Sequence, residues 1–491
     1  MKNIIKIFAL AMLLILPEAC QKYYPMVAPP IKEVEDDLDE EIGGSMPYYV
    51  TVHGSGTMDG TSWDNSMDAT GLFDLLTNYQ NLSRQPIYVA EGKYVVSNKA
   101  GEGLTLTKDI YNVKGGFSAS STGNSTTDWD PAKYVTIFSG DVNGNNRADE
   151  GDCGIFKVTS GHIKFEAVNF RHGYLNQETS ALLAGQIGAG IYINGLPLST
   201  SVTTINCEFR DNITEADNNV SGSVAGGPAV QVFAGTFKAK NTKFINNSET
   251  KGGRGGAVRF NSDDACGFFD KCLFSGNKLA GKFGSAIQVS AGHLCINNST
   301  FVDNVGDCAV INGGGAFLIC NTTVVLDSND KSDYTVRVES KSGKCTRFVN
   351  NVFTTEKSTG YGLNVNVDLK DAPDVTSFGG NIYQGIKYGD SNNKSTSIYT
   401  PAAKDVVANV SGSLSGEYWI YNPSGIMTNY ATISDVLNAV KGFNPTMSQN
   451  YTSLGVTFYE WVTEAGFKVD YRGQARNLEK LQPGSYDSNL N

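Results

Sequence analysis

One twelve-residue stretch, residues 141–152, carries oxygen side chains at the spacing of a calcium-binding loop. They stand at positions 1, 3, 5, 9 and 12, and the residue at position 7 could supply a backbone carbonyl, which is the ligand order of such loops. Asn146 replaces the usual glycine at position 6, and asparagine tolerates the left-handed backbone of that turn. Asp replaces the usual Glu at position 12. We therefore predict a calcium site, with a polar loop between two strands as the alternative, at Asp141, Asn143, Asn145, Arg147, Asp149 and Asp152.

A second group of side chains is suited to sugars. Four short segments share an apolar–polar–apolar pattern, and their flanking residues should point into a core, so that the central residues project on the outer face as one column. Successive strands lie about 4.8 Å apart. An aromatic ring, a guanidinium and two amides in a row suit sugar hydroxyls or uronates, and a solvated strand face is the alternative. The predicted ligand-binding residues are Tyr192, Gln231, Arg259 and Gln288.

Catalytic chemistry has weaker support. A polysaccharide lyase needs a base and a cation that neutralises the substrate carboxylate. Suitable residue types are spread over a glycine-rich stretch without a recognisable signature: Lys251, Arg254, Arg259, Asp263 and Asp264. Glycoside hydrolases use paired carboxylates, and no tight Asp cluster recurs between repeats. The four histidines are scattered, so we assign no catalytic residue.

A repeat must position these side chains. F-x-x-N units begin at Phe209, Phe244, Phe274 and Phe301, which are 35, 30 and 27 residues apart. They alternate with small-residue turns that lead into short apolar strands, such as Gly256-Ala257-Val258. Repeats of this size, with short strands and no helical periodicity, predict an all-β, right-handed parallel β-helix. Each Phe should stack on the Phe of the next coil, and each Asn should bond to the Asn above and below.

F-x-x-N alternating with Gly255-Gly256-Ala257-Val258 resembles the repeats of chlamydial polymorphic outer membrane proteins and of Bacteroidetes parallel β-helix proteins. The close match covers roughly residues 160 to 320, and further motifs extend the resemblance over most of the chain. It implies a pectate-lyase-like solenoid and suggests adhesion. The loop at residues 141–152 resembles dockerin loops, which implies calcium.

The amino-terminus predicts export. Lys2 and Lys6 precede an apolar run that ends before Cys20, which indicates a lipoprotein signal peptide over residues 1–19. Residues 20–46 are acidic and indicate a flexible tether from a lipidated Cys20. We therefore expect a lipid-anchored outer-membrane protein, at the cell surface or facing the periplasm.

The remaining chain is predicted to be a β-helix over residues 47–417 and a carboxy-terminal cap region over residues 418–491. Residues 72–79 have helical spacing and should cap the first coil. The net charge of −11 and the absence of a basic stripe argue against nucleic acid as a partner. Eight cysteines follow Cys20 without metal-site spacing, and we interpret them as small buried residues.

Together these observations predict a monomeric envelope lipoprotein that binds a polysaccharide or a host or cell-surface glycan, or else a protein. The alternatives are a polysaccharide lyase acting on an acidic glycan and a purely structural envelope protein, because one solenoid fold serves all three roles.

Overall fold

The computed structural model describes residues 46–78, 85–101, 103–176, 188–196, 199–215, 226–281, 283–326, 333–339, 344–357, 359–367, 374–388, 399–408, 410, 412–415, 418–421, 426–441, 443 and 464–486. The predicted signal peptide, Cys20 and almost all of the predicted tether lie outside these residues. No helix within them is long and apolar enough to cross a membrane.

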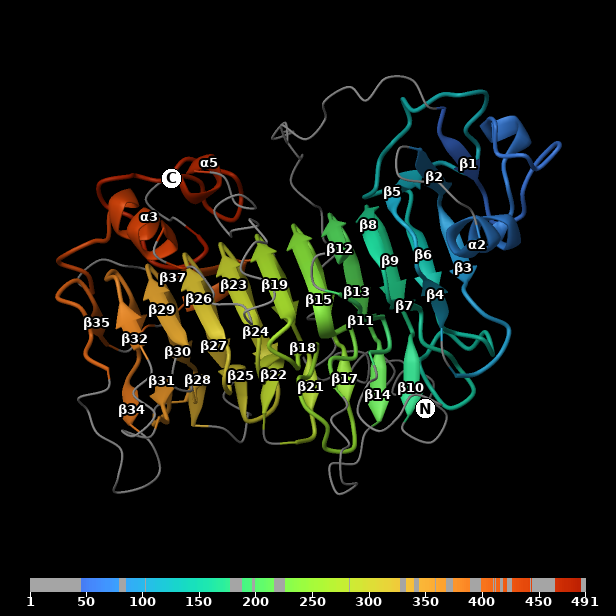
Figure 1. Cartoon of the computed structure of the whole chain (residues 1–491). Helices are drawn as coiled ribbons and strands as arrows, with labels where there is room; N and C mark the ends of the chain where they lie inside the picture. Colours follow the sequence, from blue (N-terminus) through green and yellow to red (C-terminus); the bar gives the residue numbers. More distant parts are fainter. Residues whose placement is uncertain are drawn as a thin grey trace, which may run out of the picture. The chain divides into compact units, whose positions relative to one another are not determined.

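The chain forms a parallel β-helix, as predicted. Each full coil contributes one strand to each of three faces, and neighbouring coils pair in parallel on every face (Figure 1). The first face consists of β4 (Leu104–Leu106), β7 (Phe156–Val158), β11 (Ile191–Asn194), the first part of β15 (Val230–Lys240), β18 (Val258–Phe260), β22 (Gly284–Val289), β25 (Cys308–Asn312), β28 (Tyr334–Val338), β31 (Tyr361–Val365) and β34 (Ile386–Tyr388).

The second face consists of β1 (Tyr48–Val50), β2 (Pro86–Ala90), β5 (Ile110–Phe117), β8 (Gly161–Glu166), β12 (Thr200–Ile205), the second part of β15, β19 (Ala265–Asp270), β23 (His293–Asn297), β26 (Ala316–Cys320), β29 (Cys345–Val349) and β32 (Asp374–Ser377).

The third face consists of β3 (Gly92–Val95), β6 (Thr136–Ser139), β9 (Val168–Arg171), β13 (Glu208–Arg210), β16 (Lys243–Ile245), β20 (Leu273–Ser275), β24 (Thr300–Asn304), β27 (Thr323–Leu326), β30 (Val352–Thr355), β33 (Ile382–Tyr383) and β35 (Val406–Val407). A short fourth sheet is formed by β10 (Tyr174–Asn176), β14 (Ile213–Glu215), β17 (Ser248–Glu249) and β21 (Lys278–Leu279).

Left-handed residues turn the chain between faces. One such residue separates the second-face strand from the third-face strand in successive coils, and most of these residues are asparagine, which adopts positive φ at low cost. A second left-handed residue is the third residue of each F-x-x-N unit, immediately before the Asn of that unit. Members of the two series include Asn206, Asn241 and Asn298 in the first and Asp211, Asn246 and Gly276 in the second.

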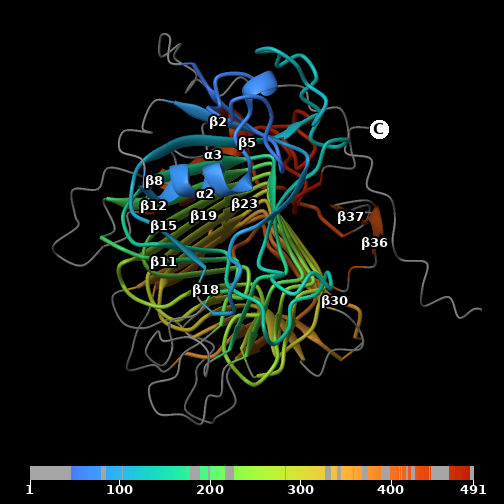
Figure 2. The same ribbon diagram turned by 90° about the vertical axis from the view of Figure 1, so that its right-hand side faces the viewer.

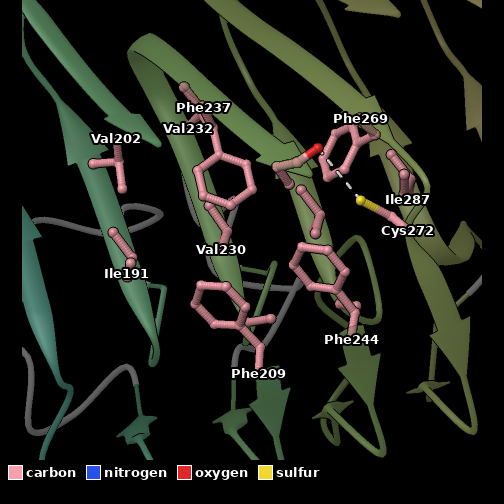
Figure 3. Close-up of a cluster of buried hydrophobic side chains, with 14 of the residues drawn as sticks. Ile191, Val202, Phe209, Val230, Val232, Phe237, Phe244, Phe269, Cys272 and Ile287 are labelled. Atoms are coloured by element: carbon pink, nitrogen blue, oxygen red, sulfur yellow. Dashed lines mark hydrogen bonds between the residues drawn. The ribbon is translucent and has the colours of Figure 1, made fainter. Parts of the chain in front are cut away.

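The F-x-x-N units behave as predicted. Rings of successive Phe residues stack, with centroids 5.2 Å apart for Phe209–Phe244 and 4.5 Å apart for Phe244–Phe274. The buried Asn247 amide donates to Asn277 Oδ1 at 3.0 Å, and the same bond recurs along the ladder. Figure 3 shows the Phe, Val and Ile side chains of several coils pointing into one core.

The predicted amino-terminal helix is present. The helix α2 (Ala69–Asn78) buries Leu72, Leu75 and Leu76 in the main core and lies across the end of the stacked coils (Figure 2). A short 3-10 helix, η2 (Trp63–Asn65), precedes it. Because α2 covers the apolar interior of the first coil, it serves as the cap that the sequence indicated.

The carboxy-terminal part packs on the side of the solenoid. The helices α3 (Ile433–Lys441) and α5 (Glu464–Phe467), with the segment that follows α5, pack on the outer side of β19, β23, β26 and β29 (Figure 1). A hairpin of β36 (Gly412–Ser415) and β37 (Tyr418–Tyr421) precedes them. The helices and the segment after α5 therefore cover the side of the second face, while Tyr421 of the hairpin packs against third-face residues such as Val325 and Val352. The sequence predicted a carboxy-terminal cap region without placing it on these faces.

The eight described cysteines are free thiols, and all except Cys345 are buried. Cys207 and Cys272 lie in the main core at the same repeat position, while Cys266, Cys295 and Cys320 lie under the carboxy-terminal segment. This agrees with their interpretation as small buried residues.

Candidate functional site

The predicted column of polar residues exists in the first face. Tyr192 pairs with Gln231, Gln231 with Arg259, and Arg259 with Gln288 in consecutive parallel strands. Their flanking residues lie in the main core, so the four side chains point away from it. The predicted register of β11, β15, β18 and β22 is therefore confirmed.

These four side chains are nevertheless buried. Tyr192 and Gln288 are 2% exposed, and Gln231 and Arg259 are 0% exposed. Glycine turns of positive φ approach the column closely, because a Cβ on Gly227 or Gly255 would lie 3.1 or 3.2 Å from the Arg259 Cβ. The alternative of a solvated strand face therefore does not hold for these positions. Their role in binding a ligand stays a prediction.

The column extends further than the sequence indicated. Lys157 pairs with Tyr192 at one end, and at the other Gln288 leads through Ile311 and Arg337 to the strands β31 and β34. The column contains four cationic side chains and no carboxylate. We call it the outer column: Lys157, Tyr192, Gln231, Arg259, Gln288, Ile311, Arg337, Asn364 and Lys387.

Aromatic and charged groups gather beside its second half. Arg337 Nη1 lies 2.9 Å from Tyr334 Oη and 3.2 Å from Asp307 Oδ2, and Arg337 also contacts Glu339. Tyr334 pairs in register with Tyr361. We call this group the Tyr334 cluster: Arg254, Phe283, Asp307, Tyr334, Arg337, Glu339, Tyr361 and Lys387.

Three cations of the Tyr334 cluster lie over rings, and one of them is Arg337, whose guanidinium is 5.6 Å from the centroid of Tyr334. The guanidinium of Arg254 is 4.3 Å from the centroid of Phe283, and Lys387 Nζ is 5.7 Å from that of Tyr334. Phe283 and Tyr361 are partly buried residues that pack against this cluster. Rings and cations side by side can stack on the apolar faces of sugars and bind their polar edges.

Two amides of the outer column carry unused hydrogen-bonding capacity. Gln288 Oε1, and both Oδ1 and Nδ2 of the fully buried Asn364, have no hydrogen-bond partner within the described part of the chain. Leaving a buried polar group unpaired costs about 1–3 kcal/mol. Native structures retain such groups for a reason, such as a bound ligand or water. The outer column therefore contains one donor and two acceptors that are both unpaired and buried in the described part of this structure.

The electrostatics of this face follow from burial. Burial, with repulsion from Arg254, lowers the pKa of Arg259 to about 9, so the guanidinium is still mostly charged at neutral pH. Burial raises the pKa of Asp307, and this effect exceeds the opposing attraction of Arg337.

The predicted calcium loop forms, and Asn146 adopts the left-handed conformation with φ of 59°. Its carboxylates face nitrogen donors. Asp152 accepts backbone N–H groups from Val142 at 2.9 Å and Asp149 at 3.0 Å. Asp149 accepts side-chain N–H groups from Asn143 and Asn145 at 2.8 and 2.6 Å. Among the described residues, no three His, Cys, Asp or Glu side chains are grouped to hold a metal ion.

The ammonium of Lys93 also contacts this loop, at Asp141. Burial would raise the pKa of Asp141, but the hydrogen bonds from Lys93 and from the Asn146 backbone outweigh it, and the pKa lies below its ordinary value. Arg147, expected to supply a carbonyl, is exposed, and its N–H donates to Asn145 Oδ1 at 2.9 Å. The residues in this arrangement do not fit a calcium cage.

The residue types considered for a lyase are not brought together as a set. Lys251 pairs with Glu215 at 2.7 Å, and Asp263 pairs with Lys344 at 2.9 Å. Arg259 donates to Asn261 Oδ1 at 2.7 Å. Among these candidates, only Arg254 and Arg259 lie at the outer column and the Tyr334 cluster.

The second half of the site was missed from sequence. The last F-x-x-N unit ends at Asn304, so the sequence offered no repeated motif by which the later coils could be aligned with the earlier ones. A signal was present, because Val336-Arg337-Val338 and Leu363-Asn364-Val365 repeat the apolar–polar–apolar pattern.

No protein-family model matches this chain, and no curated protein matches it. Among solved structures it is similar to the crystal structure of pectate lyase Pel9A, with 16% identity and a TM-score of 0.33, covering 69% of this chain and 80% of that one. The function must therefore be argued from the side chains of this chain.

Proposed function

We propose that this chain is an envelope lipoprotein whose β-helix binds a glycan along the outer column and the Tyr334 cluster. The observation that carries the proposal is the unpaired polar atoms of Gln288 and Asn364 in a column that runs beside partly buried aromatic residues. Sugar hydroxyls both donate and accept hydrogen bonds, so a sugar can satisfy an amide that protein atoms leave unpaired. The cations of the column favour an anionic sugar.

The anchoring part of the proposal rests on sequence. A lipid on Cys20 and the acidic tether would hold the β-helix in water near an outer membrane, at the cell surface or facing the periplasm. A monomer with a glycan-binding face in this position would act as an adhesin-like module.

The test uses the secreted chain with Cys20→Ser, which prevents lipidation, and a panel of acidic and neutral polysaccharides. We expect Tyr361→Ala to weaken binding about tenfold, because an aromatic contact contributes about 0.5–1.5 kcal/mol beyond its buried area. The matched control is Tyr134→Ala, which removes a ring lying 4.6 Å from the Lys133 ammonium in a loop that precedes β6. Equal losses in both variants, or no binding to any polysaccharide, would count against the proposal and favour a protein partner or a structural role.

A polysaccharide lyase remains the second candidate. It is favoured by Arg259, because a guanidinium whose pKa falls to about 9 is closer to acting as a base than an ordinary one. Absorbance of unsaturated products in the same incubations decides between the two. Product formation that disappears in Arg259→Ala would make the protein a lyase, and binding without products would support the binding module.

A further inference from the structure

A lysine from a different coil is bound to the dockerin-like loop. Lys93 lies in β3, where Tyr94 points into the core and Lys93 therefore points outward. Its ammonium contacts Asp141, the first residue of the loop, and lies 3.2 Å from Asn146 Oδ1 at position 6. The Asp141 side chain is fully buried, while that of Lys93 is 29% exposed.

Both carboxylate oxygens of Asp141 also accept backbone N–H groups. Its Oδ1 accepts the Asn145 N–H at 3.0 Å, and its Oδ2 accepts the Asn146 N–H at 2.9 Å. The carboxylate of Asp152, at the other end of the loop, likewise accepts hydrogen bonds from backbone N–H groups. Calcium requires six to eight oxygen ligands around one centre. Here the first and last carboxylates serve as acceptors for nitrogen.

We propose that Lys93 supplies the positive charge that a calcium ion supplies in loops of this sequence pattern, so that the loop keeps its conformation without metal. An ammonium is a compact cation with three donors, and it can neutralise a buried carboxylate while bonding a neighbouring carbonyl oxygen. A divalent ion would have to displace it, because two cations at one carboxylate repel each other.

The consequence concerns the start of the outer column. The loop leads through Cys153, whose N–H donates to Gly140 at 3.0 Å, into β7 and Lys157. A loop held by Lys93 positions this coil equally well in calcium-rich and calcium-poor surroundings.

Thermal unfolding of the Cys20→Ser chain, with excess calcium or with a chelator, tests the proposal. We expect the same Tm in both conditions for the wild-type sequence. Lys93→Met should lower the Tm by roughly 1–2 °C in chelator, because a given loss of stability shifts the Tm less in a long chain than in a small domain, and calcium should restore it. The control Lys99→Met removes an exposed lysine nearby and should change neither value.

Three results would overturn the inference. They are calcium stabilisation of the wild-type chain that Asp149→Asn abolishes, an unchanged Tm for Lys93→Met in chelator, and a loss in Lys93→Met that calcium does not restore. If Lys93→Met does not fold in chelator, the test is whether it folds when calcium is added, and folding in calcium would support the proposal. Should it fold in neither, calorimetric titration of the wild-type chain with calcium decides, and measurable binding at the loop contradicts the proposal.

Discussion

Single residues in this chain show which side-chain roles can be predicted from a repeat. Phe244 and Asn277 were predicted correctly because neighbouring coils supply an identical partner, so their environment is implied by the sequence itself. Arg259 was placed in the correct column, but its complete burial was not predicted. Its burial depends on the close approach of the turns at Gly227 and Gly255, and residue spacing does not report such contacts.

His293 illustrates a residue whose behaviour only the structure reveals. Its side chain is 2% exposed, and neither ring nitrogen has a hydrogen-bond partner among the described residues. Burial, with repulsion from Lys344, lowers the pKa of His293 to about 4, while Asp263 acts in the opposite direction. The folded protein therefore holds this imidazole neutral where the unfolded chain would already bind a proton.

We predict a pH dependence of stability from this residue. Between the unfolded pKa of about 6.5 and the folded pKa, the unfolded state binds more protons, so stability falls as the pH falls. The contribution of His293 to the loss between pH 7 and pH 5 should be about 2 kcal/mol. Urea unfolding of His293→Leu across this range should show a correspondingly smaller loss.

The control for this prediction lies in the same outward row of the second face. His162 is exposed, and His162→Leu should leave the pH dependence as in the wild-type chain. Parallel stability curves for His293→Leu and the wild-type chain would show that the buried imidazole does not titrate as described.

At the scale of elements, one buried arginine ties the carboxy-terminal segment together and links it to Asn298 of the solenoid. Arg476 is 4% exposed and donates to the carbonyls of Val469, Gln482 and Gly484 at 2.8–3.0 Å, and to Asn298 Oδ1 at 3.0 Å. Removal of a group that satisfies several buried acceptors costs about 1–3 kcal/mol for each acceptor left unpaired.

We predict that Arg476→Ala loosens this segment from the second face. Cys295 and Cys320, which lie beneath it, should then react with an alkylating reagent in the native protein, whereas Cys207 and Cys272 inside the solenoid should not. Peptide mass spectrometry of the alkylated protein measures the four rates separately. Arg472→Ala in the same segment changes a more exposed side chain and should have a smaller effect. Uniform labelling of all four thiols would instead indicate general unfolding.

Elements were predicted well where they belong to the repeat and poorly where they pack on its outside. α2 could be recognised because its apolar spacing shows a helix with one buried face. The position of α3 could not, because the same amphipathic pattern suits the end of a solenoid and its side equally. Its actual place depends on the apolar surface that Phe268 and Leu318 present on the second face.

At the scale of the whole molecule, the first and second faces of the described part of the chain differ in what they carry. The second face supports the carboxy-terminal segment, while the first face carries the outer column with its cations and unpaired amides. The sequence predicted this solenoid and half of the column. The full length of the outer column became visible only once β28, β31 and β34 were placed in register.

The crystal structure of this protein with an oligosaccharide that it binds tests the central claim most directly. We predict sugar density along the first face, with hydroxyl groups within hydrogen-bond distance of Gln288 Oε1 and of the Asn364 amide, and a sugar ring against Tyr361. Sugar bound on another face, with the Gln288 and Asn364 amides satisfied by protein atoms, would contradict the account.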